Sequence, residues 1–137
     1  MPIIRTDPAG LYAVPGLISL VAAPHDADLV YLSGQIGWDA DGVIQDPGDH
    51  AAQTAQIARN IDIALASLGV TREAIVKETV YVVDWSPELI PVVIGGLRDG
   101  SAAPASTLVA VAALAFPDAL VEVEVVVAVP RPAHPRP

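Results

Sequence analysis

The chain has 137 residues, the length of one domain that can bury a sizeable core. Hydrophobic residues make up 53% of the chain and charged residues 17%, so a monomer would expose apolar surface and we expect an oligomer. The net charge is −9, from 16 acidic and 7 basic residues, and the basic residues are scattered along the chain. Because nucleic-acid binding requires clustered Lys and Arg, this composition argues against a nucleic-acid partner.

Cysteine and histidine usage narrows the chemistry further. The chain has no cysteine, which excludes disulfides, thiolate nucleophiles and Cys-ligated zinc. Its three histidines, His25, His50 and His134, are too scattered to suggest a metal site, so we expect neither a metal nor another cofactor. The first residues lack the apolar core of a signal peptide, and the apolar run at residues 125–130 is too short to span a bilayer. We therefore expect a cytoplasmic protein that does not bind membranes.

The first half of the chain predicts two strands and a helix. Apolar runs at residues 16–22 and 29–36 flank the turn residues Pro24-His25-Asp26, which favours a β-hairpin. A helix is predicted from about Asp49, and Gly69 suits its C-terminus. The apolar stripe of this helix consists of Ile57, Ile61, Ala64, Leu65 and Leu68.

A second, weaker helix is predicted after a short turn at residues 72–74 and a strand over residues 75–84. Ser86-Pro87 is typical of a helix start, and the pattern reaches about Arg98. Pro91 and Gly95-Gly96 are costly inside a helix, so we expect this helix to be short, kinked or partly irregular.

Two further strands, over residues 107–114 and 120–129, complete one α/β domain of residues 1–130 with its helices on one sheet face. Residues 131–137 contain three prolines, directly after Pro130, and predict an extended tail. In the last strand, alternation places Glu122 and Glu124 on one face, about 7 Å apart. The opposite face is formed by Val121, Val123, Val125, Val127 and Val129. The two carboxylates suit a general acid or base; the alternatives are a solvated face or a salt bridge between subunits.

Several segments occur together in an order and spacing that resemble the Rid (YjgF/YER057c/UK114) family of reactive-intermediate deaminases. They are Tyr31-Leu32-Ser33-Gly34-Gln35-Ile36, Gln53-Thr54-Ala55-Gln56 with Asn60, Val76-Lys77 with Asp84, Pro104-Ala105, and Val121-Glu122-Val123-Glu124. The resemblance extends from about Gly16 to Val129. It implies a chorismate-mutase-like α/β fold with a mixed sheet, two helices on one face, and a barrel-like homotrimer with small-molecule clefts between subunits.

The resemblance also implies a site. In family members that hydrolyse enamines and imines, a glutamate on the last strand positions a water, and Glu122 matches it. The Ser-Gly pair that lines the cleft matches Ser33 and Gly34. The arginine that follows Pro-Ala and holds the substrate carboxylate is replaced here by Ser106. Losing such a charged pair weakens anchoring by about 2–5 kcal/mol.

Other positions make the expected cleft less polar. The asparagine of the family's second helix falls on Val92, and its N-terminal tyrosine falls on Leu20, or on Tyr12 if the hairpin is lengthened. Thr107, beside Ser106, is a further hydrogen-bonding candidate. Trp85 (or Tyr81) is a candidate cleft wall, against the alternative of a core or interface residue. Arg98 is a candidate replacement for the missing arginine, against the alternative of a solvated helix end.

Two functions remain open from the sequence. The first is hydrolysis of an imine, enamine or related C–N bond of a small metabolite that is not an amino-acid derivative, with Glu122 orienting the water. The second is a non-catalytic trimer that binds a small molecule or a partner in the same clefts. Ribonuclease activity, attributed to some family members, is opposed by the acidic balance of the chain.

Overall fold

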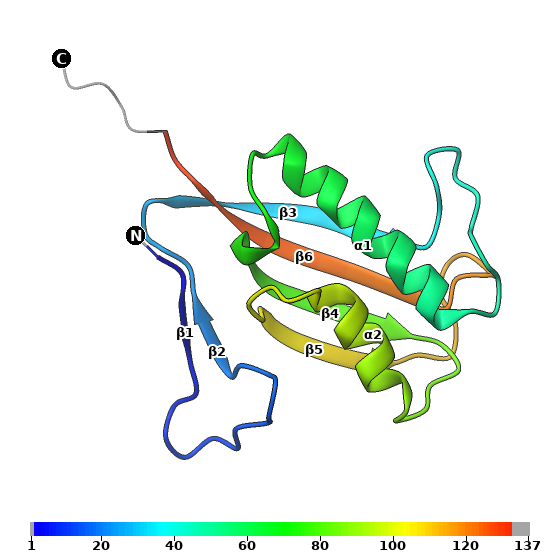
Figure 1. The fold of residues 1–137 in the computed structure, drawn as a ribbon, viewed down its shortest axis with the longest axis horizontal. Helices are drawn as coiled ribbons and strands as arrows, with labels where there is room; N and C mark the ends of the chain where they lie inside the picture. The colour runs from blue at the N-terminus through cyan, green and yellow to red at the C-terminus, as the bar shows by residue number, and fades with distance from the viewer. Residues whose placement is uncertain (1, 133–137) are drawn as a thin grey trace.

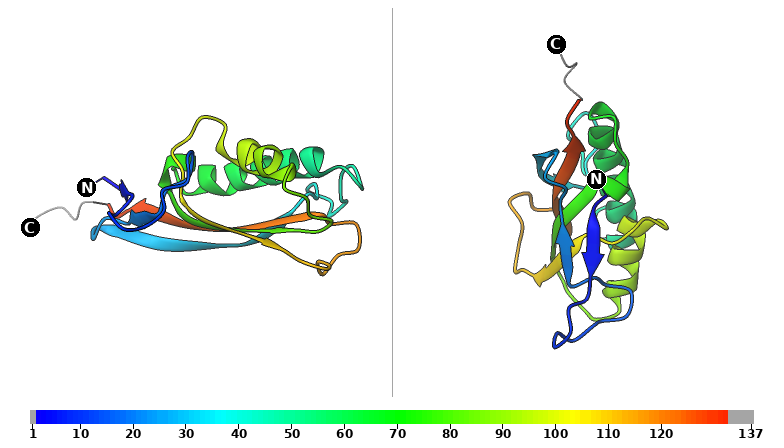
Figure 2. Two further views of the ribbon diagram at one scale, coloured as in Figure 1. Left: turned by 90° about the horizontal axis from the view of Figure 1, so that it is seen from below. Right: turned by 90° about the vertical axis from the view of Figure 1, so that its left-hand side faces the viewer.

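The computed structural model describes residues 2–132 and contains a four-stranded sheet with two α-helices on one face (Figures 1 and 2). The elements are β1 (Ile4–Thr6), β2 (Leu20–Ala22), β3 (Ala27–Ile36), α1 (His50–Ser67), the 3-10 helix η1 (Arg72–Ala74), β4 (Ile75–Val82), α2 (Leu89–Arg98), β5 (Ala105–Ala110) and β6 (Val121–Pro130). The sheet order is β3-β6-β4-β5, and only β4 and β5 are parallel. The predicted α/β class, mixed sheet and one-sided helices are confirmed.

The core lies between the sheet and the helices. Along β6 the odd-numbered valines from 121 to 127 are buried, as the alternating pattern predicts. They pack in one cluster with Ile57, Ile61 and Leu65 of α1 and with Val93 and Leu97 of α2. The even-numbered side of β6 therefore belongs to the opposite, helix-free side of the sheet.

Helix α1 begins and ends as its sequence predicts. Asp49 is the N-cap, and its side chain accepts a hydrogen bond from the Ala52 N–H at 3.0 Å. Gly69 follows the helix with φ +71°, a left-handed conformation that favours glycine. Gln53, fully buried in this helix, donates to the Asp118 carbonyl and accepts from the Leu120 N–H, which ties α1 to the start of β6.

Helix α2 is more regular than predicted. It begins at Leu89, three residues after Ser86, so Pro91 lies in the first turn, where a missing N–H costs little. It continues through both glycines to Arg98, and Asp99, with φ 43°, ends it. At Gly96 a Cβ would lie 2.9 Å from Thr54 Cγ2, so this glycine lets α2 pack closely against α1.

The predicted hairpin between residues 16–22 and 29–36 is wrong. β2 pairs with β1, a strand of three residues that is too short to be recognised from the sequence pattern. β3 pairs with β6 instead. The turn at residues 23–26 carries the chain from the small β1-β2 sheet, whose β2 contacts β4, to the edge of the main sheet. β4 and β5 also end earlier than predicted, at Val82 and Ala110.

The predicted proline-rich tail lies mostly outside the described residues, which include only Arg131 and Pro132 of it. Arg131 forms an ion pair with Asp28 of β3, with Nε 2.6 Å from Oδ1. Within residues 2–132, neither helix has the length and apolar character needed to cross a membrane.

Candidate functional site

Ser33 and Gly34 form an irregularity in β3 directly beside Glu122. The register between β3 and β6 shifts between Leu32 and Gln35, so these two residues interrupt the ladder as a bulge. A Cβ built at Gly34 would collide with the Glu122 carboxylate. The glycine therefore makes room for that carboxylate against the β3 backbone, and three residues expected in the site lie together.

Glu122 lies on the open face, by which we mean the sheet face that the helices leave uncovered. Tyr81 of β4 pairs in register with Glu122, and its hydroxyl donates to Glu124 Oε1 at 3.1 Å. That hydrogen bond raises the pKa of the Tyr81 phenol. Thr107 is also on this face, where its Oγ1 accepts from Lys77 Nζ at 2.9 Å. The open face thus carries two carboxylates, with Lys77 as the cation among its described strand residues.

Ser106 points to the other side of the sheet. It is in register with Glu78 on the parallel neighbour β4, and its Oγ donates to Glu78 Oε2 at 2.6 Å. Within one protomer, Ser106 and Glu122 therefore lie on opposite faces. The family resemblance led us to expect both in one cleft between subunits, rather than on one face of a single protomer.

Arg98 has an internal partner, which changes its expected role. Its Nη1 and Nη2 donate to Glu78 Oε1 and Oε2 at 2.6 and 2.7 Å, and Glu78 is only 3% exposed. We call Glu78, Arg98 and Ser106 the buried triad. Arg98 is neither the free substrate clamp nor the solvated helix end considered from the sequence. Glu78 was missed, although a carboxylate at a helix-facing position of an alternating strand is a signal for a buried ion pair.

The remaining predicted residues do not gather around Glu122 in the protomer. Tyr12 is 84% exposed in the loop of residues 7–19, hereafter the N-terminal loop. Val92 is on an exposed side of α2. Trp85 is half-buried and packs against the hydrophobic core, which agrees with the core alternative raised for it.

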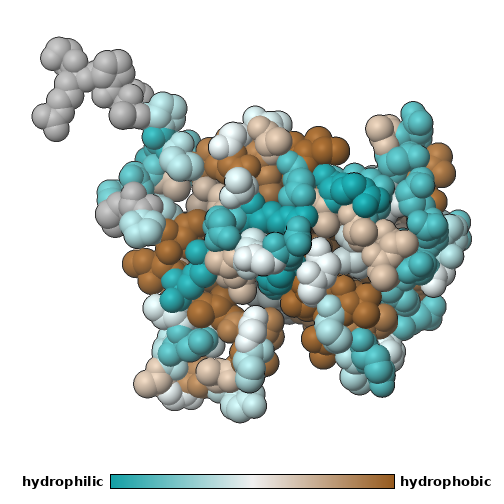
Figure 3. Space-filling model, in the orientation of Figure 1, coloured by the Kyte–Doolittle hydropathy of each residue, from teal (hydrophilic) through white to brown (hydrophobic). Residues whose placement is uncertain are grey.

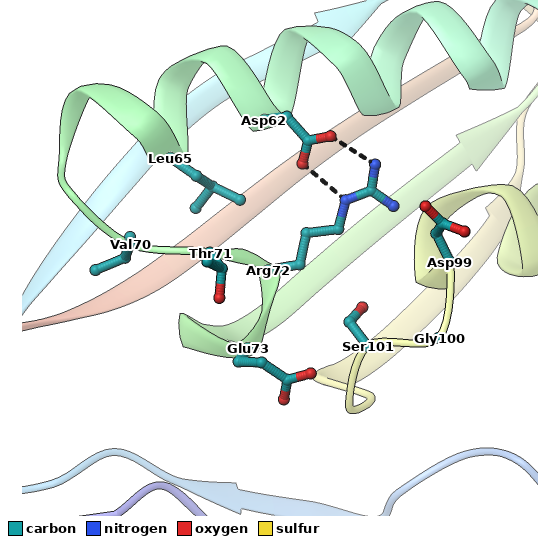
Figure 4. A pocket seen from close by; sticks show the side chains of 9 residues that line it. All are labelled: Asp62, Leu65, Val70, Thr71, Arg72, Glu73, Asp99, Gly100 and Ser101. Atoms are coloured by element: carbon teal, nitrogen blue, oxygen red, sulfur yellow. Dashed lines mark hydrogen bonds and ion pairs between the residues drawn. The ribbon is translucent and has the colours of Figure 1, made fainter.

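A polar hollow lies between the ends of α1, η1 and α2 (Figure 4). Arg72 Nε and Nη2 each donate to Asp62 at 2.8 Å, and Nη1 donates to the Leu97 carbonyl at 3.2 Å. The hydrogen bond to Asp62 raises the pKa of Arg72. Because the guanidinium is held by both helices, we interpret this hollow as a structural junction. Among residues 2–132, no group of three or more His, Asp or Glu residues is arranged to hold a metal ion.

A second hollow, the apolar cleft, lies between the N-terminal loop, α2 and β5 and has a volume of about 410 Å³. It is lined by residues 14–17 of the loop, by Ile90, Pro91, Ile94 and Gly95 of α2, and by Ser106 and Leu108 of β5. Figure 3 shows the surface notched between the loop and α2, with hydrophobic side chains on both sides. The cleft could not be located from the sequence, because the N-terminal hairpin was misassigned.

These observations agree with comparisons to known proteins. Residues 16–129 match the family described as Endoribonuclease L-PSP, so the chain belongs to this family, which is the Rid/YjgF family that its motifs resemble. A similar solved structure is YyfB of Yersinia pestis, a protein of unknown function of the conserved Rid family. It is 28% identical, with a TM-score of 0.84, over 93% of this chain and 99% of that chain.

Two further structures are similar over most of the chain. YyfA of Yersinia pestis is 30% identical with a TM-score of 0.65, over 85% of this chain and 90% of that chain. A putative endoribonuclease L-PSP from Entamoeba histolytica is 28% identical with a TM-score of 0.64, over the same shares, 85% and 90%. Family membership and fold are thus as the sequence predicted.

Proposed function

We propose that this protein hydrolyses the C=N bond of a small uncharged imine, or of the enamine in equilibrium with it, in clefts between the subunits of a homotrimer. The observation that carries this proposal is the position of the Glu122 carboxylate in the space left by Gly34. A carboxylate that lies against a backbone bulge at the edge of the sheet is suited to orient one water molecule.

The reaction needs little more than this. An imine carbon is electrophilic, so a water held by Glu122 attacks it, forming the C–O bond while the C=N π electrons move to nitrogen. Glu122 accepts the proton that the water loses and returns it to that nitrogen, which gives a carbinolamine. The carbinolamine then breaks its C–N bond as its hydroxyl proton passes to nitrogen through Glu122, releasing ammonia and a carbonyl compound. Ser33 and Thr107, on the same face, are candidates for hydrogen bonds to the substrate.

The charges of the site favour an uncharged substrate. The open face carries Glu122 and Glu124, which repel a carboxylate and outnumber Lys77, the cation among its described strand residues. Both terminal nitrogens of Arg98 are engaged by Glu78, and Ser106 has replaced the arginine of the family pattern. The protomer therefore offers no free guanidinium, among its described residues near the site, to hold an amino-acid carboxylate.

The open face also supports assembly of several copies. Tyr31 is 73% exposed and Leu29 48% exposed, and both project from β3 beside Val126 and Ala128 of β6. A sheet face with such residues is normally covered. We propose that further copies of the chain cover it, as in a barrel-like trimer, and that the clefts at its edges complete the site.

The alternative is a trimer that binds a small molecule or a partner without catalysis, which the loss of the arginine favours. RNA cleavage, suggested by the family description, is opposed by the net charge of −9. We place the protein in the cytoplasm, without a metal or cofactor requirement.

Competition assays with semicarbazide test the proposal. Uncharged imines are generated from primary amines by an amine oxidase, and carboxylate-bearing imines from amino acids by an amino-acid oxidase. We expect the protein to accelerate hydrolysis of the uncharged set only. Glu122→Gln should lower the rate by about 100-fold or more, since it removes the proton acceptor and keeps the shape. Glu124→Gln, the same change two residues along, is the control and should retain the rate.

Unchanged turnover in Glu122→Gln would remove Glu122 from the mechanism. Absence of activity on both sets would leave the non-catalytic alternative in first place.

A further inference from the structure

A third hollow lies at the end of β6 that is farthest from Glu122. It is bounded by β1, by the turn that leads into β3, by residues 69–74 around η1 and by the end of β6, and we call it the β1–η1 hollow. Figures 1 and 2 show β1 and the end of β6 together at one end of the molecule. Ala128, in its wall, is six residues along β6 from Glu122, about 20 Å at the rise of a strand. The hollow shares no lining residue with the apolar cleft, so it is separate from the proposed hydrolysis.

The size and lining of the β1–η1 hollow suit a small molecule. Its volume of about 540 Å³ lies within the range of about 300–1,000 Å³ usual for ligand pockets. Most of its wall is aliphatic, including Ile3 and Val70, and its charged lining residues are Arg5, Asp26 and Glu73. In a hollow of this kind the few charged groups determine which ligand fits.

Arg5 brings a positive charge into the hollow without a counterion. Its Nε donates to the Ala103 carbonyl at 2.9 Å and its Nη2 to the Glu73 carbonyl at 2.8 Å, and both acceptors are neutral backbone groups. Within residues 2–132, no carboxylate forms an ion pair with Arg5, whereas three other arginines each face a carboxylate at 2.6 to 2.8 Å. The two backbone contacts fix the guanidinium and leave Nη1 available to bind an anion.

Glu73 places a negative charge in the same wall. Its carboxylate Oε1 accepts from the Ala102 N–H at 3.0 Å, and Oε2 has no hydrogen-bond partner in the part of the chain that the structure describes. Figure 4 shows the Glu73 side chain on the other side of η1 from the ion pair between Arg72 and Asp62. Arg5 and Glu73 thus line one hollow without forming an ion pair with each other. Such an arrangement is complementary to a ligand that carries both charges.

We propose that the β1–η1 hollow binds a small zwitterion, with a carboxylate and an ammonium group on an apolar body, as in an apolar amino acid. The carboxylate accepts from Arg5 Nη1, and the ammonium group donates to Glu73 Oε2. The apolar body lies against the aliphatic wall. A carboxylate without the ammonium group is repelled by Glu73, and an amine without the carboxylate is repelled by Arg5. This binding goes beyond the proposed hydrolysis and does not depend on it.

Three probes that share one apolar body test the proposal by NMR titration of the full chain at neutral pH. They are L-phenylalanine, 3-phenylpropanoate, which lacks the ammonium group, and 2-phenylethylamine, which lacks the carboxylate. We expect L-phenylalanine to bind at least tenfold more tightly than either of the others, with the largest shifts at residues 3–5 and 69–74. Equal binding of all three, the absence of saturable binding, or shifts confined to other parts of the chain would overturn the proposal.

Glu73→Gln tests the ammonium contact without disturbing Arg5, because Arg5 is held by the backbone carbonyl of residue 73. We expect this variant to lose the preference for L-phenylalanine over 3-phenylpropanoate. Glu88→Gln, the same change at an exposed residue outside the hollow, is the control and should keep the preference.

A second pair of variants locates the binding. Ala27→Leu enlarges a residue that lines the hollow and should abolish the saturable shifts. Ala23→Leu, an equal enlargement at an exposed residue that does not line the hollow, is the control and should bind as the unmodified protein does.

An unaltered preference in Glu73→Gln would overturn the proposal, and so would unaltered binding by a folded Ala27→Leu variant. If Ala27→Leu does not fold, the comparison of Glu73→Gln with Glu88→Gln decides alone. Glu122→Gln should bind L-phenylalanine normally. A failure of the hydrolysis assay therefore leaves this test intact, and the converse also holds.

Discussion

At the scale of single residues, the buried triad decides which chemistry the chain can perform on the helix side of its sheet. Glu78 accepts hydrogen bonds from both terminal nitrogens of Arg98 and from Ser106, so three polar groups satisfy one another in a nearly dry environment. Arg98 Nε is left without a hydrogen-bond partner. The triad neutralises the charge of an arginine that would otherwise be available to hold a substrate carboxylate.

Removing one member of the buried triad should strongly lower the free energy of unfolding. Glu78→Gln leaves the Arg98 charge buried without a counterion, so we expect a loss of about 3–5 kcal/mol in the free energy of unfolding. Asp62→Asn is the matched control, since it removes a bidentate partner of Arg72 that is 49% exposed; its cost should stay below about 1 kcal/mol. Urea unfolding at one fixed protein concentration measures both. Equal losses of unfolding free energy in the two variants would show that burial does not set the contribution of the Glu78–Arg98 ion pair.

The triad also predicts the behaviour of Ser106→Arg. The new guanidinium would face Glu78, which Arg98 already occupies, so two cations would share one carboxylate. We expect this variant to be less stable and to gain no activity on carboxylate-bearing imines. Adding Arg98→Gln to it should recover stability, because one cation then faces one anion. Hydrolysis of amino-acid imines by the Ser106→Arg variant alone would show that Glu78 does not capture the new guanidinium.

At the scale of elements, the sequence predicts a helix or strand well where the pattern lies within that segment. It does not predict which separate segments pair with one another. Helix α1 could be predicted with its cap, because Asp49, the apolar stripe and Gly69 are all signals within the segment itself. The valine alternation of β6 likewise defined both of its faces. The β1-β2 pairing crosses the loop of residues 7–19, the contact between Glu78 and Arg98 crosses 20 positions, and β3 pairs with β6 from the other end of the chain; no local pattern specifies these contacts.

In helix α2, two neighbouring glycines differ in this way: local helix propensity decides the effect of a substitution at Gly95, and contact with α1 decides it at Gly96. Gly95→Ala should stabilise the protein by about 0.5–1 kcal/mol, because a Cβ there meets nothing and alanine has the higher helix propensity. Gly96→Ala should destabilise it by about 1–3 kcal/mol, because Thr54, held by its hydrogen bond to the His50 carbonyl, has to move. Thermal unfolding of the two variants compares them directly. Changes of the same sign would mean that α2 does not pack on α1 as described.

At the scale of the whole molecule, the two faces of the sheet differ in what covers them. The helices cover one face (Figure 2), and the open face retains exposed aromatic and aliphatic residues beside Glu122. The resemblance of the motifs to the Rid family anticipated the fold, which the family match confirms. Within one protomer Gly34 and Glu122 meet, whereas Ser106 lies on the other face of the sheet; the cleft predicted for them lies between subunits and stays a prediction.

A charge on the open face should therefore prevent assembly. Tyr31→Glu introduces a carboxylate at the centre of the proposed interface, and its burial against a second copy would leave it unpaired. We expect sedimentation velocity to change from a species of about three chains to single chains. Ile63→Glu is the control, because Ile63 is 70% exposed on α1, almost as much as Tyr31 at 73%. If Ile63→Glu dissociates the assembly and Tyr31→Glu does not, the copies meet through the helices, and the site around Glu122 is open to solvent in every protomer.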